Sequence, residues 1–367
     1  MPDVTRLTKL DMKKCSLPSD LSSENFDVLV AKCPMIGSID LEEEQGFDAI
    51  VSLQSLPYLR NMQSDSANLC LQHIKESGFE NLDSLELGAD ENENIVALIA
   101  LCASSNLRAL SLDHGCLQTV NDGIALARLL AAMDVLESLS LYGNLSFGWQ
   151  AFPAFAEAAP RSRLRFLNLG ECGLAGCDSG RALASLMQQM PELCSLCLRK
   201  NHRLQNSGLL AFAERLSCHG SLATLDLSCC AASGQVGTGA ILNIVEALPS
   251  LRTLSVSGNT QLQEDALRSL LDAVVSKTAV RSLSLASCGL SARDMNLQDI
   301  FFPDVECQLE SLDLSGNSEI GALGLQTLVP WLPSTIQRLD LGDCGLESVA
   351  GGAAIAALVR KCSHEQR

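Results

Sequence analysis

Cysteine and histidine are the residue types of this chain best suited to metal or redox chemistry. Cys194-x-x-Cys197 has the spacing of a redox motif or of half a zinc site, but no second pair completes it. The histidines are scattered without the spacing of zinc ligands, at His73, His114, His202, His219 and His364. We therefore expect neither a metal nor a cofactor. In the repeat pattern, both cysteines of the motif lie on the surface of a strand, and Cys229 is exposed.

Two further motifs suggest chemistry that their context does not support. Gly234-Gln-Val-Gly237-Thr-Gly239 resembles a phosphate-binding loop, but it lacks the Gly-Lys-Ser/Thr ending and the dinucleotide-binding spacing. We interpret it as a flexible lead into a helix. Asn144-Leu-Ser146 matches a glycosylation acceptor, yet the repeat gives Asn144 a structural turn position. Since no serine-histidine-aspartate or paired-carboxylate arrangement stands out, we expect no enzymatic activity.

The composition favours a repetitive, aliphatic core. Of the 367 residues, 47% are hydrophobic, which excludes global disorder, but only 4% are aromatic. The core must therefore be built mostly from leucine and alanine. The N-terminus has no apolar leader and no apolar run reaches the length of a membrane span, so we expect a cytoplasmic protein with reduced cysteines.

The net charge of −17 argues against nucleic acids and anionic membranes as partners. The acid is concentrated near the N-terminus, because residues 1–100 contain 7 Lys or Arg and 18 Asp or Glu. If a charged partner is attracted, we expect it at this N-terminal third.

A pattern of the form Leu-x-x-Leu-x-Leu-x-x-(Asn or Cys) repeats along the chain. One unit contains Leu193, Leu196, Leu198 and Asn201. With gaps of 27–29 residues, the last position of successive units is occupied by Asn144, Cys172, Asn201, Cys230, Asn259, Cys288, Asn317 and Cys344. Such regular spacing does not arise by chance.

The pattern weakens toward the N-terminus but persists, and Leu7, Leu10, Met12 and Cys15 restore its full form. We count thirteen units and expect one domain over residues 1–367. Within it, residues 1–104 form degenerate, acidic repeats, residues 105–350 form regular repeats of 28–29 residues, and residues 351–367 form the last helix and a tail.

Each unit is predicted to form a strand, a turn, a helix and a return. The leucines of Leu-x-Leu alternate with an outward residue, as in a strand. An asparagine at the turn can bind backbone groups, so that stacked turns form a buried ladder. Residues 123–133, 207–216 and 265–275 have the apolar spacing of helices. Because one unit cannot bury its own leucines, the units must stack. A closed β/α barrel is excluded, since it has eight units with longer strands.

Repeats of 28–29 residues whose turn alternates between asparagine and cysteine resemble the ribonuclease-inhibitor-like class of leucine-rich-repeat proteins. The resemblance implies an α/β solenoid shaped like a horseshoe, with a parallel sheet on the concave face and helices on the convex face. It also implies a protein ligand. Members include cytosolic ribonuclease inhibitors, the GTPase activator of Ran, innate-immune sensors and scaffold subunits, among which the fold does not choose.

Partners of this class usually bind the concave sheet. Acidic residues dominate its two ends in this chain, and small polar residues its middle. The candidate partner-binding residues are Asp11, Asp40, Glu42, Glu43, Asp65, Glu86, Asp113, Tyr142, Phe166, Asp226, Asp313 and Asp340. An acidic concave face would suit a basic protein, but a chain of this charge places acids on any solvent-facing surface. Both interpretations stay open.

We therefore expect a non-enzymatic interaction module or a scaffold subunit of a larger assembly. One alternative is a GTPase activator resembling that of Ran, although the acidic tail typical of that group is missing from this sequence. Another is an inhibitor of a basic enzyme. The concave face has few aromatic and arginine residues, which argues against a tight-binding inhibitor of this kind. Little capping sequence is visible, which favours docking of one solenoid end onto a protein.

Overall fold

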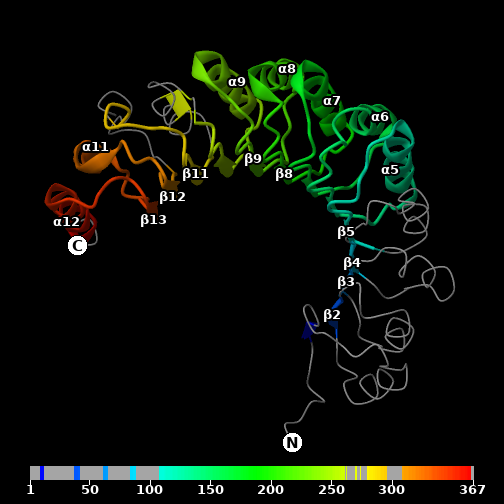
Figure 1. Cartoon of the computed structure of the whole chain (residues 1–367), viewed down its shortest axis with the longest axis horizontal. Helices are drawn as coiled ribbons and strands as arrows, with labels where there is room; N and C mark the ends of the chain where they lie inside the picture. Colours follow the sequence, from blue (N-terminus) through cyan, green and yellow to red (C-terminus); the bar gives the residue numbers. More distant parts are fainter. Residues whose placement is uncertain are drawn as a thin grey trace, which may run out of the picture. The chain divides into compact units, whose positions relative to one another are not determined.

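The computed structural model describes residues 9–11, 37–41, 61–64, 83–87, 107–260, 262, 269–270, 273, 279–295 and 308–364. The chain divides into two compact units, Met1–Cys172 and Gly173–Arg367. In each unit, short parallel strands follow one another in sequence order, and the described helices lie on one side of them (Figure 1). Among the described residues, no helix has the length and apolar character needed to cross a membrane.

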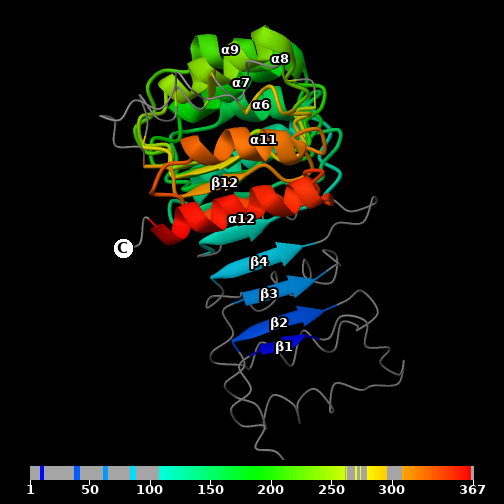
Figure 2. The ribbon, with the colours of Figure 1, turned by 90° about the vertical axis from the view of Figure 1, so that its left-hand side faces the viewer.

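The described strands of the first unit are three or four residues long and parallel, and Figure 2 shows the first four side by side. They are β1 (Lys9–Asp11), β2 (Ser38–Leu41), β3 (Asn61–Ser64), β4 (Ser84–Leu87), β5 (Ala109–Ser111), β6 (Ser138–Ser140) and β7 (Phe166–Asn168). The register aligns Leu110 with Leu139 and Leu139 with Leu167. These leucines are 1–3% exposed, so one central residue per strand fills the core.

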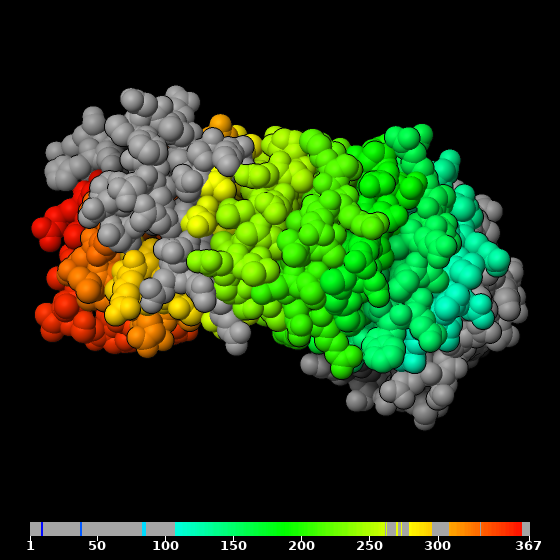
Figure 3. Space-filling view, turned by 90° about the horizontal axis from the view of Figure 1, so that it is seen from above, coloured from blue at the N-terminus to red at the C-terminus, as the bar shows by residue number. Residues whose placement is uncertain are grey.

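The second unit repeats this plan with β8 (Ser195–Cys197), β9 (Thr224–Asp226), β10 (Thr253–Ser255), β11 (Ser282–Ser284), β12 (Ser311–Asp313) and β13 (Arg338–Asp340). Its described helices are α7 (Gly176–Gln188), α8 (Gln205–Arg215), α9 (Gly234–Glu246), α11 (Gly321–Leu328) and α12 (Val349–His364), with the short 3-10 helix η3 (Val329–Trp331) after α11. In Figure 3, which looks onto the helix side, the atoms of α7, α8 and α9, coloured green to yellow-green, form one continuous surface.

In the first unit, α5 (Val120–Ala132) and α6 (Ala151–Ala158) begin in different ways. Thr119 caps α5 because its hydroxyl accepts from the Asp122 N–H, while the Asp122 carboxylate accepts from the Thr119 N–H. No side chain caps α6. Instead its start is anchored by aromatic packing, with Phe147 and Phe152 fully buried and 5.7 Å apart between ring centroids.

Glycines set the close spacing between neighbouring helices of the second unit. A Cβ added to Gly180 in α7 would lie 2.1 Å from the carbonyl oxygen of Gly208 in α8. Similarly, a Cβ at Gly237 would lie 2.6 Å from Asn206 Oδ1. The interpretation of residues 234–239 as a flexible lead is therefore wrong. These residues form the first turns of α9, where glycine allows the helix to pack closely.

The asparagines at the turn positions are fully buried and bind the backbone of neighbouring repeats. Asn259 is 1% exposed, and its side-chain oxygen accepts from the N–H groups of Cys230 and Ala232. Its amide nitrogen donates to the carbonyl oxygens of Leu227 and Val256. One side chain thus satisfies four buried backbone groups, which would otherwise be costly to bury.

The cysteines at the alternate turns satisfy fewer groups. Cys230 Sγ donates to the Leu198 carbonyl oxygen at 3.2 Å, and Cys288 Sγ donates to that of Val256 at 3.4 Å. Their backbone N–H groups are in turn bound by the asparagines of the following repeats, Asn259 and Asn317. Successive turns therefore alternate between an asparagine, which can bind four backbone groups, and a cysteine, which is smaller and forms weaker hydrogen bonds.

The predicted succession of strand, turn and helix is confirmed. The helices expected at residues 123–133 and 207–216 are α5 and α8, each starting two or three residues earlier. The last helix begins at Val349 rather than Gly351 and runs to His364. Most of the helix expected at residues 265–275 lies outside the described residues. The count of thirteen units and the single cooperative domain stay predictions.

We predict that Asn259→Ala destabilises the protein more than Cys288→Ala. The first change leaves several buried backbone groups unsatisfied, which is expected to cost about 3 kcal/mol. The second removes one weak donor and a small volume, at about 1 kcal/mol. Urea unfolding followed by circular dichroism measures both. Equal losses of stability would show that the asparagine ladder contributes no more than the cysteine positions.

Gly180→Ala and Gly239→Ala form a second matched pair. A Cβ at Gly180 meets the Gly208 carbonyl, so we expect a loss of about 1–3 kcal/mol. Gly239 is also helical but has nothing within 4 Å of an added Cβ, so alanine there should stabilise by about 0.5–1 kcal/mol. Thermal unfolding of the two variants tests the opposite signs, and a stabilising Gly180→Ala would contradict the close helix contact.

Candidate functional site

The face of the sheet turned away from the helices, here named the open face, is the candidate site. In each strand from β5 to β12 the central residue is a buried leucine. The residues on either side are half-buried or exposed. These flanking side chains therefore lie on the solvent side of the sheet. A second solvent-facing position, here named the second open position, lies two residues beyond the last residue of a strand, as Ser228 does after β9 and Ser257 after β10.

In the first unit, the open face carries a bonded group of polar side chains. Asp113 accepts from the Ser140 hydroxyl at 2.6 Å and from the Tyr142 N–H at 2.8 Å. Asn168 donates to the Ser140 oxygen at 3.1 Å. The Tyr142 hydroxyl donates to Glu171, which holds the ring in place. Both predicted residues in this group, Asp113 and Tyr142, are thus fixed by their neighbours.

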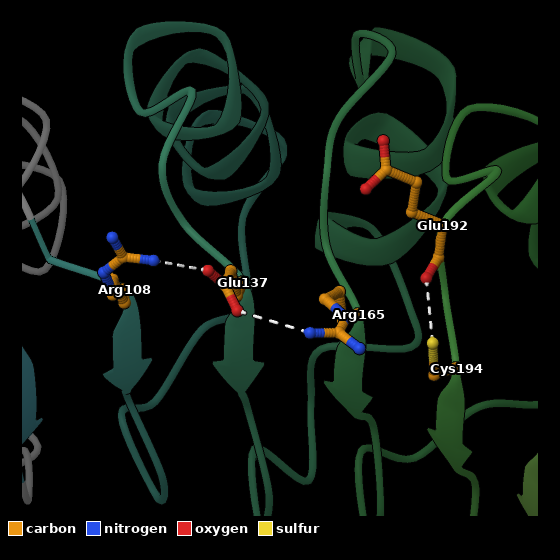
Figure 4. A network of polar contacts seen from close by, with 5 residues as sticks. All are labelled: Arg108, Glu137, Arg165, Glu192 and Cys194. Atoms are coloured by element: carbon orange, nitrogen blue, oxygen red, sulfur yellow. Dashed lines mark hydrogen bonds and ion pairs between the residues drawn. The ribbon is translucent and has the colours of Figure 1, made fainter.

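The edge at which the strands of the first unit begin carries alternating charges. Glu137 pairs with Arg108 at 2.6 Å and with Arg165 at 3.8 Å (Figure 4). These side chains are 36–62% exposed, so each pair adds little to stability. Phe166, the next residue after Arg165, is 47% exposed. This edge therefore offers an aromatic ring beside a row of charges.

A chain of hydroxyl groups crosses the open face of the second unit. Ser228 and Ser255 are 2.7 Å apart between hydroxyl oxygens, Ser255 and Ser257 are 3.2 Å apart, and Ser257 and Ser284 are 2.7 Å apart. The Ser284 hydroxyl donates to the Asp313 carboxylate at 2.6 Å. These four serines come from β10, β11 and the segments that follow β9 and β10.

Asp313 fixes the direction of this hydroxyl chain. An ionised carboxylate only accepts, so Ser284 must give it its single proton and accept from Ser257. The same reasoning makes Ser257 accept from Ser255 and Ser255 accept from Ser228. All four hydroxyl protons are therefore donated within the hydroxyl chain. The serines offer a ligand only the lone pairs of their oxygens, which are hydrogen-bond acceptors.

The Asp313 carboxylate, at the end of the hydroxyl chain, is held in its charged form. Partial burial alone would raise the pKa of Asp313, but hydrogen bonds from Ser284 and Ser315 outweigh it, and the pKa is lowered. The stabilisation from these bonds is present above the ordinary aspartate pKa and is lost as the pH falls through the lowered value. On β9, the Asp226 carboxylate accepts hydrogen bonds from the Ser228 N–H and from the Cys197 thiol.

In the Cys194-x-x-Cys197 motif, Cys197 is not an activated thiol. Burial raises the pKa of Cys197 to about 11, with nearby Asp226 adding to the effect. Cys194 Sγ donates to the Glu192 carbonyl oxygen at 3.2 Å (Figure 4). The described residues contain no group of three His, Cys, Asp or Glu side chains suited to a metal ion. The prediction that Cys229 is exposed is wrong, because it is half-buried below Gly258.

The structure describes only part of the predicted acidic face. Asp11 and Asp40 are direct partners on β1 and β2, and Glu86 is aligned with Ser111 between β4 and β5. Asp340 follows Asp313 in register on β13. Cys15, Glu42, Glu43 and Asp65 lie outside the described residues. Whether any of these residues binds a partner stays a prediction.

Sequence reasoning missed two kinds of surface residue. Leu145 and Trp149 lie in the turn after β6 and are 67% and 69% exposed. The turn pattern itself could have indicated them, since they follow Asn144 where the other turns are mostly polar or glycine-rich. The serines at the second open position, Ser228 and Ser257, were also missed, because they are neither charged nor aromatic, unlike Asp113 and Tyr142 at the same position of other repeats.

Comparison with known proteins agrees with this geometry. A family model described as Leucine Rich repeat matches residues 307–329. The "Tonsoku-like protein" of Bos taurus is 29% identical over 273 residues, which cover 69% of this chain and 19% of that protein. The Bos taurus "NACHT, LRR and PYD domains-containing protein 5" is 33% identical over 124 residues, which cover 32% and 11%. This chain spans about a fifth or less of the length of these curated relatives.

Two solved structures share the fold. A chain in the crystal structure of the Rad7 and Elc1 complex in yeast has a TM-score of 0.55 at 16% identity, with 85% of this chain and 77% of that chain covered. The leucine-rich repeat-containing protein LegL7 from Legionella pneumophila has a TM-score of 0.52 at 16% identity, with 96% and 98% covered. Likeness at this identity shows the fold alone.

The accessibility of the cysteines predicts an order of alkylation in the folded protein. Cys177 and Cys218 are exposed and should react with iodoacetamide first. Cys197 should react more slowly, because its pKa of about 11 leaves little thiolate at neutral pH. Cys230 and Cys288 are buried and should react only after unfolding. Peptide mass spectrometry with and without denaturant gives the order. Labelling of Cys230 as fast as Cys218 in the native protein would contradict the buried ladder.

Proposed function

We propose that this chain, a leucine-rich-repeat protein, is a non-enzymatic interaction module or scaffold subunit that binds a basic segment of another protein on the open face of its sheet. The binding surface would be the hydroxyl chain and the aspartates of the second unit. The ribonuclease-inhibitor-like class remains part of this proposal. It is supported by the repeat length and by the alternation of asparagine and cysteine at the turns.

The observation that carries the proposal is the direction of the hydroxyl chain. Since Ser284 donates to Asp313, each earlier serine donates along the chain and none keeps a proton for a ligand. A partner can therefore satisfy this surface only by bringing donors. Lysine and arginine carry several donors and no acceptor, which makes them the best-matched side chains.

The surface is also organised before a partner arrives. The serines between β9 and β12 are short, half-buried and bonded to each other. Holding them in place on binding costs little rotamer entropy compared with ordering long side chains. Because they are small, a long cationic side chain has room to lie across the sheet and reach Asp226 or Asp313.

The charges around the face are mixed, which limits where a cation is stabilised. Arg252 is exposed at the start of β10, and Arg281 pairs with Glu310 at 2.8 Å at the starts of β11 and β12. These arginines lie at the opposite end of the strands from Ser228 and Ser257. A basic segment is therefore expected along the strand ends that carry the serines and aspartates. The net charge of −17 would speed its approach.

The relatives support a role in an assembly only in general terms. One of the matched structures is a crystal structure of the Rad7 and Elc1 complex, so a protein of this fold occurs there in a complex. A cytoplasmic location is likewise part of the proposal. It is supported by ten cysteines that are free thiols in the structure, several of which act as thiol donors in the ladder.

An inhibitor of a basic enzyme would use the same open face. The acceptor surface suits such a ligand equally well, and only the identity of the partner separates it from a scaffold. A GTPase activator resembling that of Ran is a different activity. Single-turnover hydrolysis of GTP by a small GTPase, measured with and without this chain, distinguishes it from both.

We predict that the double variant Ser255→Lys and Ser284→Lys binds the partner more weakly. The new ammonium groups would pair with Asp313 and repel a basic segment, so the affinity for the partner should fall at least about tenfold. Affinity purification from the native source at low salt, followed by mass spectrometry, identifies the partner. Titration with the purified partner then measures the loss.

The matched control adds the same charges to the helix side, with Gln188→Lys and Gln235→Lys in α7 and α9. Both glutamines are exposed, so the fold should be unaffected. This control should bind as the unmodified chain does. Binding should also weaken with added salt, since exposed charges are screened. Equal binding by both double variants would place the partner elsewhere, and the open-face proposal would be abandoned.

A further inference from the structure

Three arginines stand close together on the first unit, at the edge where its strands begin. Arg161, Arg163 and Arg165 occupy alternate positions of the segment that joins α6 to β7, and all three are exposed. Between them, Ser162 is half-buried and Leu164 is 0% exposed. The exposure therefore alternates as it does in an extended chain, and the three side chains leave the segment on its solvent side.

The backbone of this segment is held at both ends. At its start, Ala159 is extended, with φ −61° and ψ 125°, and Pro160 has a fixed φ. At its end, the N–H groups of Arg165 and Phe166 donate to the Glu137 carbonyl oxygen at 2.8 and 3.0 Å. A ligand therefore meets arginines on a fixed backbone, and binding has to order only their side chains.

The charges of these arginines are poorly compensated within the protein. Among the described residues, none forms an ion pair with Arg161 or Arg163. Arg165 lies 3.8 Å from Glu137, whose carboxylate is closer to Arg108, at 2.6 Å (Figure 4). All three arginines can therefore bind an external carboxylate without giving up a strong internal ion pair.

The neighbouring repeat does not cancel this charge. The segment that joins α5 to β6, residues 133–137, contains two carboxylates, Asp134 and Glu137. The segment of residues 159–165 contains three arginines and no carboxylate. These two adjacent segments together carry a positive charge, although the whole chain has a net charge of −17.

An exposed aromatic ring lies beside the arginines. Phe166 is the first residue of β7 and is 47% exposed. The other strands from β5 to β12 begin with alanine, serine or threonine, so the fold does not require a large side chain at this position. Arginine and aromatic residues together are typical of the residues that dominate binding energy in protein interfaces. Arg161, Arg163, Arg165 and Phe166 are here named the arginine patch.

The chemistry of the arginine patch matches an acidic segment that also carries an apolar side chain. A guanidinium group binds a carboxylate through two parallel hydrogen bonds. In an extended segment, carboxylates at alternate positions are about 6–7 Å apart, which is also the spacing of arginines at alternate positions. An apolar side chain next to the carboxylates can cover Phe166. Nucleic acid is a poorer match, because its phosphates would be repelled by the net charge of the chain.

We propose that the arginine patch of the first unit binds an acidic, extended segment of a partner protein. This site is separate from the hydroxyl chain of the second unit, and it selects ligands of the opposite charge. Either site can therefore fail without the other. If both bind, one chain holds an acidic and a basic segment at the same time.

Fluorescence anisotropy of a labelled peptide added to the full chain tests the proposal. The probe has the sequence Leu-Glu-Ser-Glu-Ser-Glu-Leu, with carboxylates at alternate positions and a leucine at each end. The double variant Arg161→Gln and Arg163→Gln should bind it at least about tenfold more weakly, and Phe166→Ala at least about threefold more weakly. The matched control, Arg128→Gln and Arg215→Gln, removes two exposed arginines from helices α5 and α8 and should bind the peptide as the unmodified chain does.

A variant that binds more tightly excludes misfolding as the explanation. Glu137→Gln removes the carboxylate that competes for Arg165, so it should strengthen binding of the peptide at least about threefold. Glu157→Gln removes an exposed carboxylate from α6 and should change the affinity much less.

Two further ligands test the chemistry of the site. The peptide with glutamine in place of each glutamate should bind at least about tenfold more weakly, because it has lost the carboxylates. A heptathymidine oligonucleotide should also bind more weakly than the acidic peptide. The proposal would be overturned by an acidic peptide that does not bind, by binding that is insensitive to the arginine variant, or by tighter binding of the oligonucleotide.

Discussion

The structure depends on how each strand ends. The chain must turn sharply inside a buried layer, where the backbone groups of the turn cannot reach water. The buried asparagines solve this problem, since Asn259 and Asn317 each bind backbone groups of two repeats. Each such side chain fixes the next repeat relative to the last. The regular spacing of strands and the row of small residues on the open face follow from this constraint.

The same constraint divides the residues between stability and function. Leucines and turn residues are fixed by packing, and glycines such as Gly180 are fixed by the closeness of the helices. The positions that flank the central leucine of each strand, and the second open position that follows, are left to vary. In the second unit several of these positions hold serine or aspartate. Parallel pairing aligns Ser284 with Asp313, to which it donates, and it brings Ser228 and Ser257 within reach of Ser255 and Ser284 of the next repeat. Keeping such short polar side chains ordered costs little conformational entropy.

The sequence was sufficient to predict the repeated strand, turn and helix, because leucine spacing records which residues face the core. It could also place Asp226 and Asp313 on the open face. It could not predict the hydroxyl chain through Ser228 and Ser257, since this depends on the lateral register between repeats. The role of Gly237 was misread for a similar reason. A glycine-rich segment resembles a loop in sequence, whereas the need for glycine arises from Asn206 in the neighbouring repeat.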